Sequence, residues 1–172
     1  MLYFKQNNEC NMIVIDKNFY PKKEALKRCE DFMKNSTVFF SDGSFTAGKN
    51  EGGYGFISLG KVNARESGVA PAKTPVEMEL QAIKHTLIYL NLNKDKIDNT
   101  KIVIFNDCLN AISKIKQYTE NPNKPESLLD EIYGLLKALS DKDLLICWLK
   151  KESLKYHEQV DNLSKVARTV ER

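Results

Sequence analysis

The sequence predicts an α/β protein with a mixed β-sheet and helices on its faces. Three runs with strand character, at residues 37–41, 54–59 and 64–69, follow one another with Gly-rich or polar turns between them. From Thr74 to the C-terminus, helical and strand patterns alternate. A three-strand meander followed by alternating helices and strands is typical of a mixed sheet that helices cover.

Residues 1–36 are predicted to form a small appendage to a domain of residues 37–172. Apolar runs at Leu2–Phe4 and Met12–Ile15 predict two short strands. A helix is predicted over Pro21–Lys34, because Pro suits a first helical turn and the apolar residues after it have helical spacing. The role of the appendage is open between packing on the domain and dimerisation, and the oligomeric state is open with it.

The second half of the chain alternates between the two periodicities. A helix is predicted from Thr74 to the Asn/Lys-rich stretch before Lys101, because apolar residues recur there every three or four positions. The remaining elements are a β-branched strand at 101–106, helices at 109–118 and 127–139, a strand at 144–149 and a closing helix from about Tyr156.

The composition excludes several classes of protein. A chain of 172 residues, of which 42% are hydrophobic and 28% charged, can bury the core of one folded domain and does not resemble a disordered chain. No apolar stretch approaches the roughly 20 residues that cross a bilayer, and no signal peptide is recognisable. The four cysteines are scattered and are expected to be reduced thiols. We therefore expect a cytoplasmic protein that does not enter a membrane.

Four acidic residues fall where the predicted fold can gather them. Asp42 and Asp107 each follow an apolar strand, VFF and IVIF, and Glu79 and Asp161 lie on predicted helices. Ligands of open α/β sheets collect beyond the carboxyl ends of the strands, so Asp42 and Asp107 should share one crevice. Carboxylates held that close raise one another's pKa unless a cation lies between them, which indicates a site for Mg²⁺ or Mn²⁺.

Each acid alone also has an ordinary structural explanation. The string SDGS, which contains Asp42, reads as a turn. Glu79 reads as a solvated helix residue, and Asp161 as a charge that complements a helix dipole. The net charge of +3 is too small to indicate a nucleic-acid ligand by itself, but two divalent cations on four carboxylates would raise it by about four.

The sequences around these acids resemble the type 1 ribonuclease H family. VFFSDGS followed by GGYGFI resembles that family's first strand and Gly-rich turn, with Asp42 at the strand end. MELQAI with Glu79 resembles its helix, IVIFND with Asp107 its fourth strand, and CWLKK then VDNLSKVA with Asp161 its C-terminal part. The resemblance covers about residues 37–168. It implies a ribonuclease H-like fold, with a mixed five-stranded sheet of three antiparallel strands then two parallel ones, and helices on both faces.

The resemblance also implies a two-metal endonuclease that cuts the RNA strand of RNA/DNA hybrids and leaves 5′-phosphate and 3′-hydroxyl ends. The cofactor would be two Mg²⁺ ions, which Mn²⁺ can replace. Carried over to this chain, Asp42 would bridge both ions and Asp161 would hold the ion beside the attacking water. Glu79 and Asp107 would hold the other ion.

Substrate contacts are implied at three further positions. Gly43 and Ser44 follow the first acid directly, and Thr74 matches a family position that binds a phosphate of the DNA strand.

The chain also departs from the family at substrate-binding positions. Relatives commonly carry two Asn before the helix Glu and a Gln after the fourth-strand Asp, where this chain has Pro75, Val76 and Leu109. The basic segment that many bacterial members insert after the fourth strand is missing, since TENPNKP joins two predicted helices. Weaker hybrid binding is therefore expected.

His157 is a further candidate for catalysis. It lies four residues before Asp161, about one helical turn, so both side chains can share a helix face. Its imidazole could protonate the leaving oxygen or help to displace the product. The family usually carries a His in the loop after the last strand, whereas this chain reads KKESLKYHEQ there. Glu152 or Glu158 could do the same job, and His85 is expected to be structural.

Two other interpretations stay open. A binding protein that kept this fold but lost catalysis would be expected to lack one of the acids, and all four are present. A junction resolvase or a transposase core would share a carboxylate cluster but would lack the series SDGS, GGYG and MEL. Cleavage trials on hybrid, duplex DNA and duplex RNA separate these interpretations.

Overall fold

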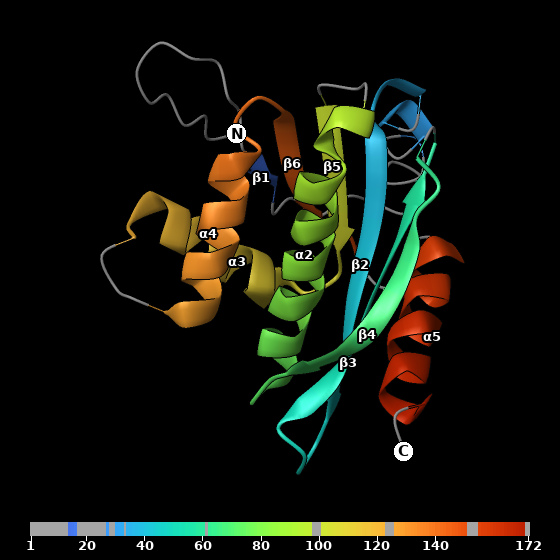
Figure 1. Ribbon diagram of the computed structural model, residues 1–172, viewed down its shortest axis with the longest axis vertical. Coiled ribbons are helices and arrows are strands. Elements are labelled where there is room, and N and C mark those ends of the chain that lie inside the picture. The colour runs from blue at the N-terminus through green and yellow to red at the C-terminus, as the bar shows by residue number, and fades with distance from the viewer. Residues whose placement is uncertain are drawn as a thin grey trace.

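The computed structural model describes residues 14–16, 27, 30–32, 34–60, 62–97, 101–122, 126–150 and 155–170. A six-stranded sheet runs through the molecule, and Figure 1 shows helices on both of its faces. In spatial order the strands are β1 (Val14–Asp16), β6 (Asp143–Trp148), β5 (Lys101–Asn106), β2 (Thr37–Thr46), β3 (Glu51–Leu59) and β4 (Arg65–Pro71). The helical elements are α2 (Pro75–Leu92), a 3₁₀ turn (Lys94–Lys96), α3 (Leu109–Glu120), α4 (Ser127–Ala138) and α5 (Lys155–Val170).

The strand order confirms the predicted mixed sheet. β2, β3 and β4 are antiparallel neighbours, whereas β2, β5 and β6 run parallel, and these are the five predicted strands. Side chains alternate along a strand, so each face of the sheet has its own core. Phe39 and Ile104 pack in the core on the side of α2, α3 and α4, whereas Phe40 and Val103 pack in the core beneath α5. Figure 1 shows α5 on the other side of the sheet from α2. Within the described part of the chain, no helix combines the length and apolar character needed to cross a membrane.

Part of the N-terminal segment packs on this sheet. β1 overlaps the predicted strand at Met12–Ile15, whose first two residues lie outside the described part of the chain. It pairs in parallel with β6, as a sixth strand at the sheet edge. The predicted strand at Leu2–Phe4 lies outside the described residues. The described residues of the predicted helix Pro21–Lys34 are helical, and the Phe32 ring lies 6.2 Å from the Phe105 ring. These contacts support the packing role that the sequence left open.

The first long strand extends further than predicted. The predicted strand stopped just before Asp42, but β2 continues to Thr46 in antiparallel pairing with β3. Only the parallel pairing with β5 stops early, at Phe40 opposite Phe105. Asp42 therefore lies inside a strand, two residues beyond the end of the parallel ladder, and SDGS is not a turn.

Glycines explain why both strands of this hairpin are longer than their propensity suggests. Gly is depleted in strands, so a reading from propensity ends β2 and begins β3 at the wrong residues. A Cβ on Gly43 would lie 2.5 Å from the Met78 carbonyl carbon in α2, and a Cβ on Gly53 would lie 1.9 Å from the Ser164 carbonyl oxygen in α5. The two helices thus approach the sheet more closely than a side chain would allow, and both come beside Asp42.

His85 on α2 stacks on the Tyr54 ring, with the ring centroids 3.7 Å apart and the planes 10° from parallel. Burial, with a contribution from the nearby Lys84 charge, lowers the pKa of His85 to about 4. Its side chain is therefore neutral at physiological pH, which agrees with the structural role expected from the sequence.

The lowered pKa predicts a pH-dependent stability. Between the unfolded pKa of His, about 6.5, and the folded value, the unfolded chain binds more protons than the folded protein. The stability from neutral His85 is therefore full above pH 6.5 and is lost as the pH falls towards 4. Urea unfolding of wild type and His85→Gln at pH 7.5 and pH 5 measures this loss. We expect a smaller loss in the variant, and an equal loss in both proteins would refute the assignment.

Candidate metal centre

Three of the four predicted carboxylates come together at one end of the parallel ladder. Asp42 comes from β2, Glu79 from the first turns of α2, and Asp107 from the position directly after β5. Each offers one carboxylate oxygen, and these oxygens lie within 4.8 Å of one another. Asp42 is buried, with 3% of its surface exposed, and the other two are partly buried. We refer to these three residues as the carboxylate cluster.

Glu79 is held in the cluster by two donors. Its Oε2 accepts a hydrogen bond from the Gly43 backbone N–H at 2.9 Å and another from the Asn106 side-chain amide at 3.0 Å. The same Asn106 amide nitrogen lies 3.1 Å from the Ser41 carbonyl oxygen, and its Oδ1 accepts from the Cys108 N–H. Asn106 therefore ties α2 to the ends of β2 and β5. Sequence reasoning missed this residue, although it directly precedes a predicted ligand.

The electrostatics of the cluster favour a cation. Burial raises the pKa of Glu79 well above its usual value, and the charges of Asp42 and Asp107 raise it further. The hydrogen bonds from Asn106 and Gly43 act in the opposite direction. A divalent cation bound by these carboxylates would remove their mutual repulsion, and an all-oxygen donor set suits hard ions such as Mg²⁺ or Mn²⁺. The residues present therefore fit the predicted metal.

The position of Asp107 is fixed through its backbone. The indole N–H of Trp148, at the end of β6, donates to the Asp107 carbonyl oxygen at 2.9 Å. One residue further on, the Leu149 N–H donates to the Asn106 carbonyl oxygen at 3.1 Å. The carboxyl ends of β5 and β6 are thus joined beside the cluster, as expected for a ligand site of a parallel sheet.

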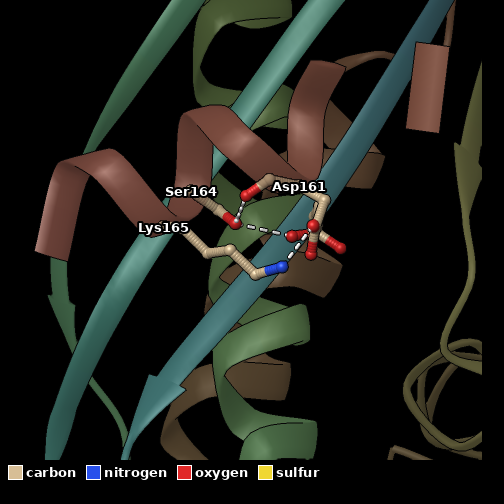
Figure 2. Close-up of polar contacts among 4 residues, drawn as sticks. Asp161, Ser164 and Lys165 are labelled. Atoms are coloured by element: carbon tan, nitrogen blue, oxygen red, sulfur yellow. Dashed lines mark hydrogen bonds and ion pairs between the residues drawn. The ribbon is translucent and has the colours of Figure 1, made fainter. Parts of the chain in front are cut away.

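Asp161, the fourth predicted carboxylate, lies on α5 and has a cationic neighbour on its own helix. Its Oδ2 lies 2.5 Å from Lys165 Nζ, one helical turn later, and its side chain is 16% exposed (Figure 2). It does not belong to the carboxylate cluster found among the described residues. Ser164 lies between Asp161 and the carboxylate cluster. Its hydroxyl is 2.9 Å from the Asp161 main-chain carbonyl oxygen and 2.6 Å from Asp42 Oδ2.

His157 lies in the core between α5 and the sheet. Only 3% of its surface is exposed, and its ring meets the Phe40 ring edge-on at a centroid distance of 5.5 Å. Tyr156 packs on the same Phe40 ring. This placement favours a packing role for His157 over the acid–base role suggested by the sequence. Of the two carboxylates considered in its place, Glu158 is exposed and Glu152 lies outside the described residues.

The predicted substrate-binding residues lie in β2 and at the N-terminus of α2, the elements that carry Asp42 and Glu79. Gly43 gives its N–H to Glu79, and Ser44 is the next, partly buried residue of β2. Thr74 caps α2, because its hydroxyl accepts a hydrogen bond from the Glu77 N–H at 3.1 Å, and it is exposed. Contact of these residues with a substrate stays a prediction.

The positions that depart from the family are also exposed or partly buried. Pro75 and Val76 form the first turn of α2, next to the cap, and Leu109 begins α3 with 39% of its surface exposed. α3 ends at Glu120 and α4 begins at Ser127, so the segment TENPNKP joins these two helices directly, as the sequence predicted.

A cavity of about 290 Å³ lies where the β2–β3 hairpin meets the C-terminal part of α5. Two cationic side chains contribute to its lining, Lys49 from the hairpin and Arg168 from α5. Arg168 Nη1 donates to the Phe45 carbonyl oxygen at 3.0 Å, which holds the helix to the hairpin. Arg168 follows Asp161 by seven residues, about two helical turns along the same helix.

Comparison with known protein families gives a match over most of the chain. The family model described as RNase H matches residues 34–167. The matched segment begins just before β2 and ends within α5, so it contains all four predicted carboxylates. A search of curated proteins found no match.

Proposed function

The chain belongs to the RNase H family, and from this we propose that it is an endonuclease that hydrolyses the RNA strand of RNA/DNA hybrids. The observation that carries the proposal is the carboxylate cluster, whose ligand oxygens lie within 4.8 Å of one another. The family match points to the class of substrate. The cluster offers a place for the metal ions that this type of hydrolysis uses.

Two divalent cations, Mg²⁺ or Mn²⁺, are the proposed cofactor. Asp42, Glu79 and Asp107 would hold one of them. By resemblance to the family, Asp42 together with Asp161 would hold the other. When bound, two such ions activate a water as the nucleophile and stabilise the leaving 3′ oxygen, so the products would carry 5′-phosphate and 3′-hydroxyl ends.

The chain's own groups hold two of the proposed metal ligands in place. Gly43 and Asn106 fix the Glu79 carboxylate, and Trp148 fixes the backbone of Asp107. Ligands that are already held in place need little rearrangement during the reaction, which is where much of an enzyme's electrostatic advantage arises. Asp161 differs from these residues because its carboxylate forms an ion pair with Lys165. A divalent cation would have to share this carboxylate with Lys165 or displace the lysine from it.

The proposed path of the substrate crosses the cluster between α2 and α5. Thr74, at the N-terminus of α2, is suited to a phosphate because N-terminal helix ends attract anions. The cavity between the β2–β3 hairpin and the C-terminal part of α5 contains Lys49 and Arg168, which offer two positive charges to a further phosphate of the nucleic-acid backbone. Thr74 caps α2, which carries Glu79, and Arg168 lies on α5, which carries Asp161.

We expect the RNA strand of a hybrid to be cut, and duplex DNA and single-stranded RNA to be left intact. An RNA strand in a helix displays its 2′-hydroxyls across a wide, shallow minor groove, and duplex DNA has no such groups. Incubation of each labelled substrate with Mg²⁺ and the protein measures this preference. Equal cutting of duplex DNA would assign the chain to another class of nuclease. Tight binding of hybrid with no cutting would indicate a binding protein of the same fold.

A further inference from the structure

Ser164 has a buried hydroxyl that lies against the Asp42 carboxylate and the main-chain carbonyl of Asp161. Its side chain lies on α5, three residues after Asp161, and none of its surface is exposed. The hydroxyl oxygen lies 2.6 Å from Asp42 Oδ2 in β2 and 2.9 Å from the Asp161 carbonyl oxygen. Figure 2 shows this hydroxyl and the Lys165 side chain on the same side of α5, beside Asp161.

The distances indicate which acceptor receives the single hydroxyl proton. A hydroxyl that donates to a carboxylate is normally found at about 2.5–2.7 Å, and a neutral contact is longer. The 2.6 Å contact with Asp42 is within the shorter range, whereas the 2.9 Å contact with the Asp161 carbonyl oxygen is not. The proton is therefore assigned to the bond from Ser164 Oγ to Asp42 Oδ2.

The backbone of Ser164 has little freedom to move. A Cβ on Gly53 would lie 1.9 Å from its carbonyl oxygen, and a Cβ on Gly55 would lie 3.1 Å from its nitrogen. The helix backbone thus rests directly on β3 at this residue, so the hydroxyl is presented to Asp42 from a fixed point. A donor held on one carboxylate oxygen restricts rotation of the whole group, and this determines where the second oxygen lies.

We propose that Ser164 is a positioning residue that orients the Asp42 carboxylate for binding the divalent cations. Through the same hydrogen bond it holds the turn of α5 that carries Asp161 in a fixed position relative to Asp42. The inference rests on the proposed function, because it concerns the same metal centre. Groups that orient metal ligands in this way typically contribute about 10–100-fold to metal affinity. Removing the Ser164 hydroxyl should therefore weaken metal binding by about tenfold without unfolding the protein.

The test measures metal binding without substrate. Mn²⁺ is titrated into wild type, Ser164→Ala and Ser164→Cys in reducing buffer, and free Mn²⁺ is followed by its electron paramagnetic resonance signal. The expected Kd of Ser164→Ala is about ten times that of wild type, and the Cys variant should fall between them because a thiol is a weak donor. The matched control is Thr86→Val, which also removes a buried helix hydroxyl, one bonded to the Ala82 carbonyl oxygen at 2.9 Å.

A thermal melt in EDTA accompanies each titration, so that a loss of fold is not mistaken for a loss of metal. If Ser164→Ala does not fold, the volume-preserving Cys variant decides the matter. An unchanged Mn²⁺ Kd in a folded Ser164 variant, or an equal loss in Thr86→Val, would overturn the inference. A wild type that binds Mn²⁺ but does not cut hybrids would defeat the proposed function and leave this inference standing.

Discussion

Asp42→Asn and Asp107→Asn are each expected to lower the rate of hybrid cleavage by at least about a hundredfold. Both carboxylates belong to the carboxylate cluster, and an amide offers a cation neither a negative charge nor two equivalent oxygens. The fold should persist, because both residues lie beyond the last pair of the β2–β5 parallel ladder and neither belongs to the apolar cores.

The metal-free stability of these variants provides a second readout. The charges of Asp42 and Asp107 both raise the pKa of Glu79, so removing either charge relieves repulsion in the cluster. We therefore expect the Tm in EDTA to hold or rise while kcat at saturating hybrid and Mg²⁺ collapses. Asp95→Asn, at an exposed residue of the 3₁₀ turn, is the matched control and should change neither quantity. Residual activity above about a hundredth of wild type in either cluster variant would contradict a ligand role.

Gly53→Ala is expected to cost about 3 kcal/mol or more of stability. The added Cβ would lie 1.9 Å from the Ser164 carbonyl oxygen, and both partners are backbone groups that cannot rotate away. Relief requires α5 to move off the sheet, which would separate Ser164 from Asp42 and displace Asp161. A shift of about 1 Å in a catalytic group can cost about a hundredfold in rate, so cleavage should fall with stability.

Gly134→Ala is the matched control for this prediction. Gly134 lies within α4, and a Cβ added there would meet nothing within 4 Å. Because Ala is the better helix former, this variant should gain roughly 0.5–1 kcal/mol and keep full activity. Urea unfolding and kcat on hybrid measure both variants. A Gly53→Ala protein with wild-type stability would show that α5 does not rest on β3 as described.

Periodicity was enough to predict the elements that form the sheet and its cores. The strand at Lys101–Asn106 has the predicted bounds, and α2 begins at Pro75, one residue after the predicted start at Thr74. The β2–β3 hairpin was predicted too short, because its glycines serve close contacts with α2 and α5 that no single-chain propensity contains. The pairing of β1 with β6 joins segments that are far apart in the sequence, so local propensity does not predict it either.

The site was predictable in part for a similar reason. Asp42 and Asp107 follow apolar strands, and parallel strands carry such residues to a common edge, so their meeting follows from topology. The groups that orient them are single polar residues, Asn106 and Ser164, which have no periodic pattern of their own. His157 lies on the same helix face as Asp161, so the sequence suggested a catalytic role for it. In the structure, His157 packs against the Phe40 ring of the sheet, a contact that the sequence of the helix does not reveal.

The proposed function is metal-dependent cleavage of the RNA strand of hybrids at the carboxylate cluster. The most direct test is an RNA/DNA hybrid with either strand labelled, incubated in Mg²⁺ or Mn²⁺ with wild type or with Asp107→Asn. We expect wild type to cut only the RNA strand, EDTA to stop the reaction, and Asp107→Asn to leave both strands intact. Equal RNA cleavage by the two proteins, or cleavage that continues in EDTA, would refute the proposed function.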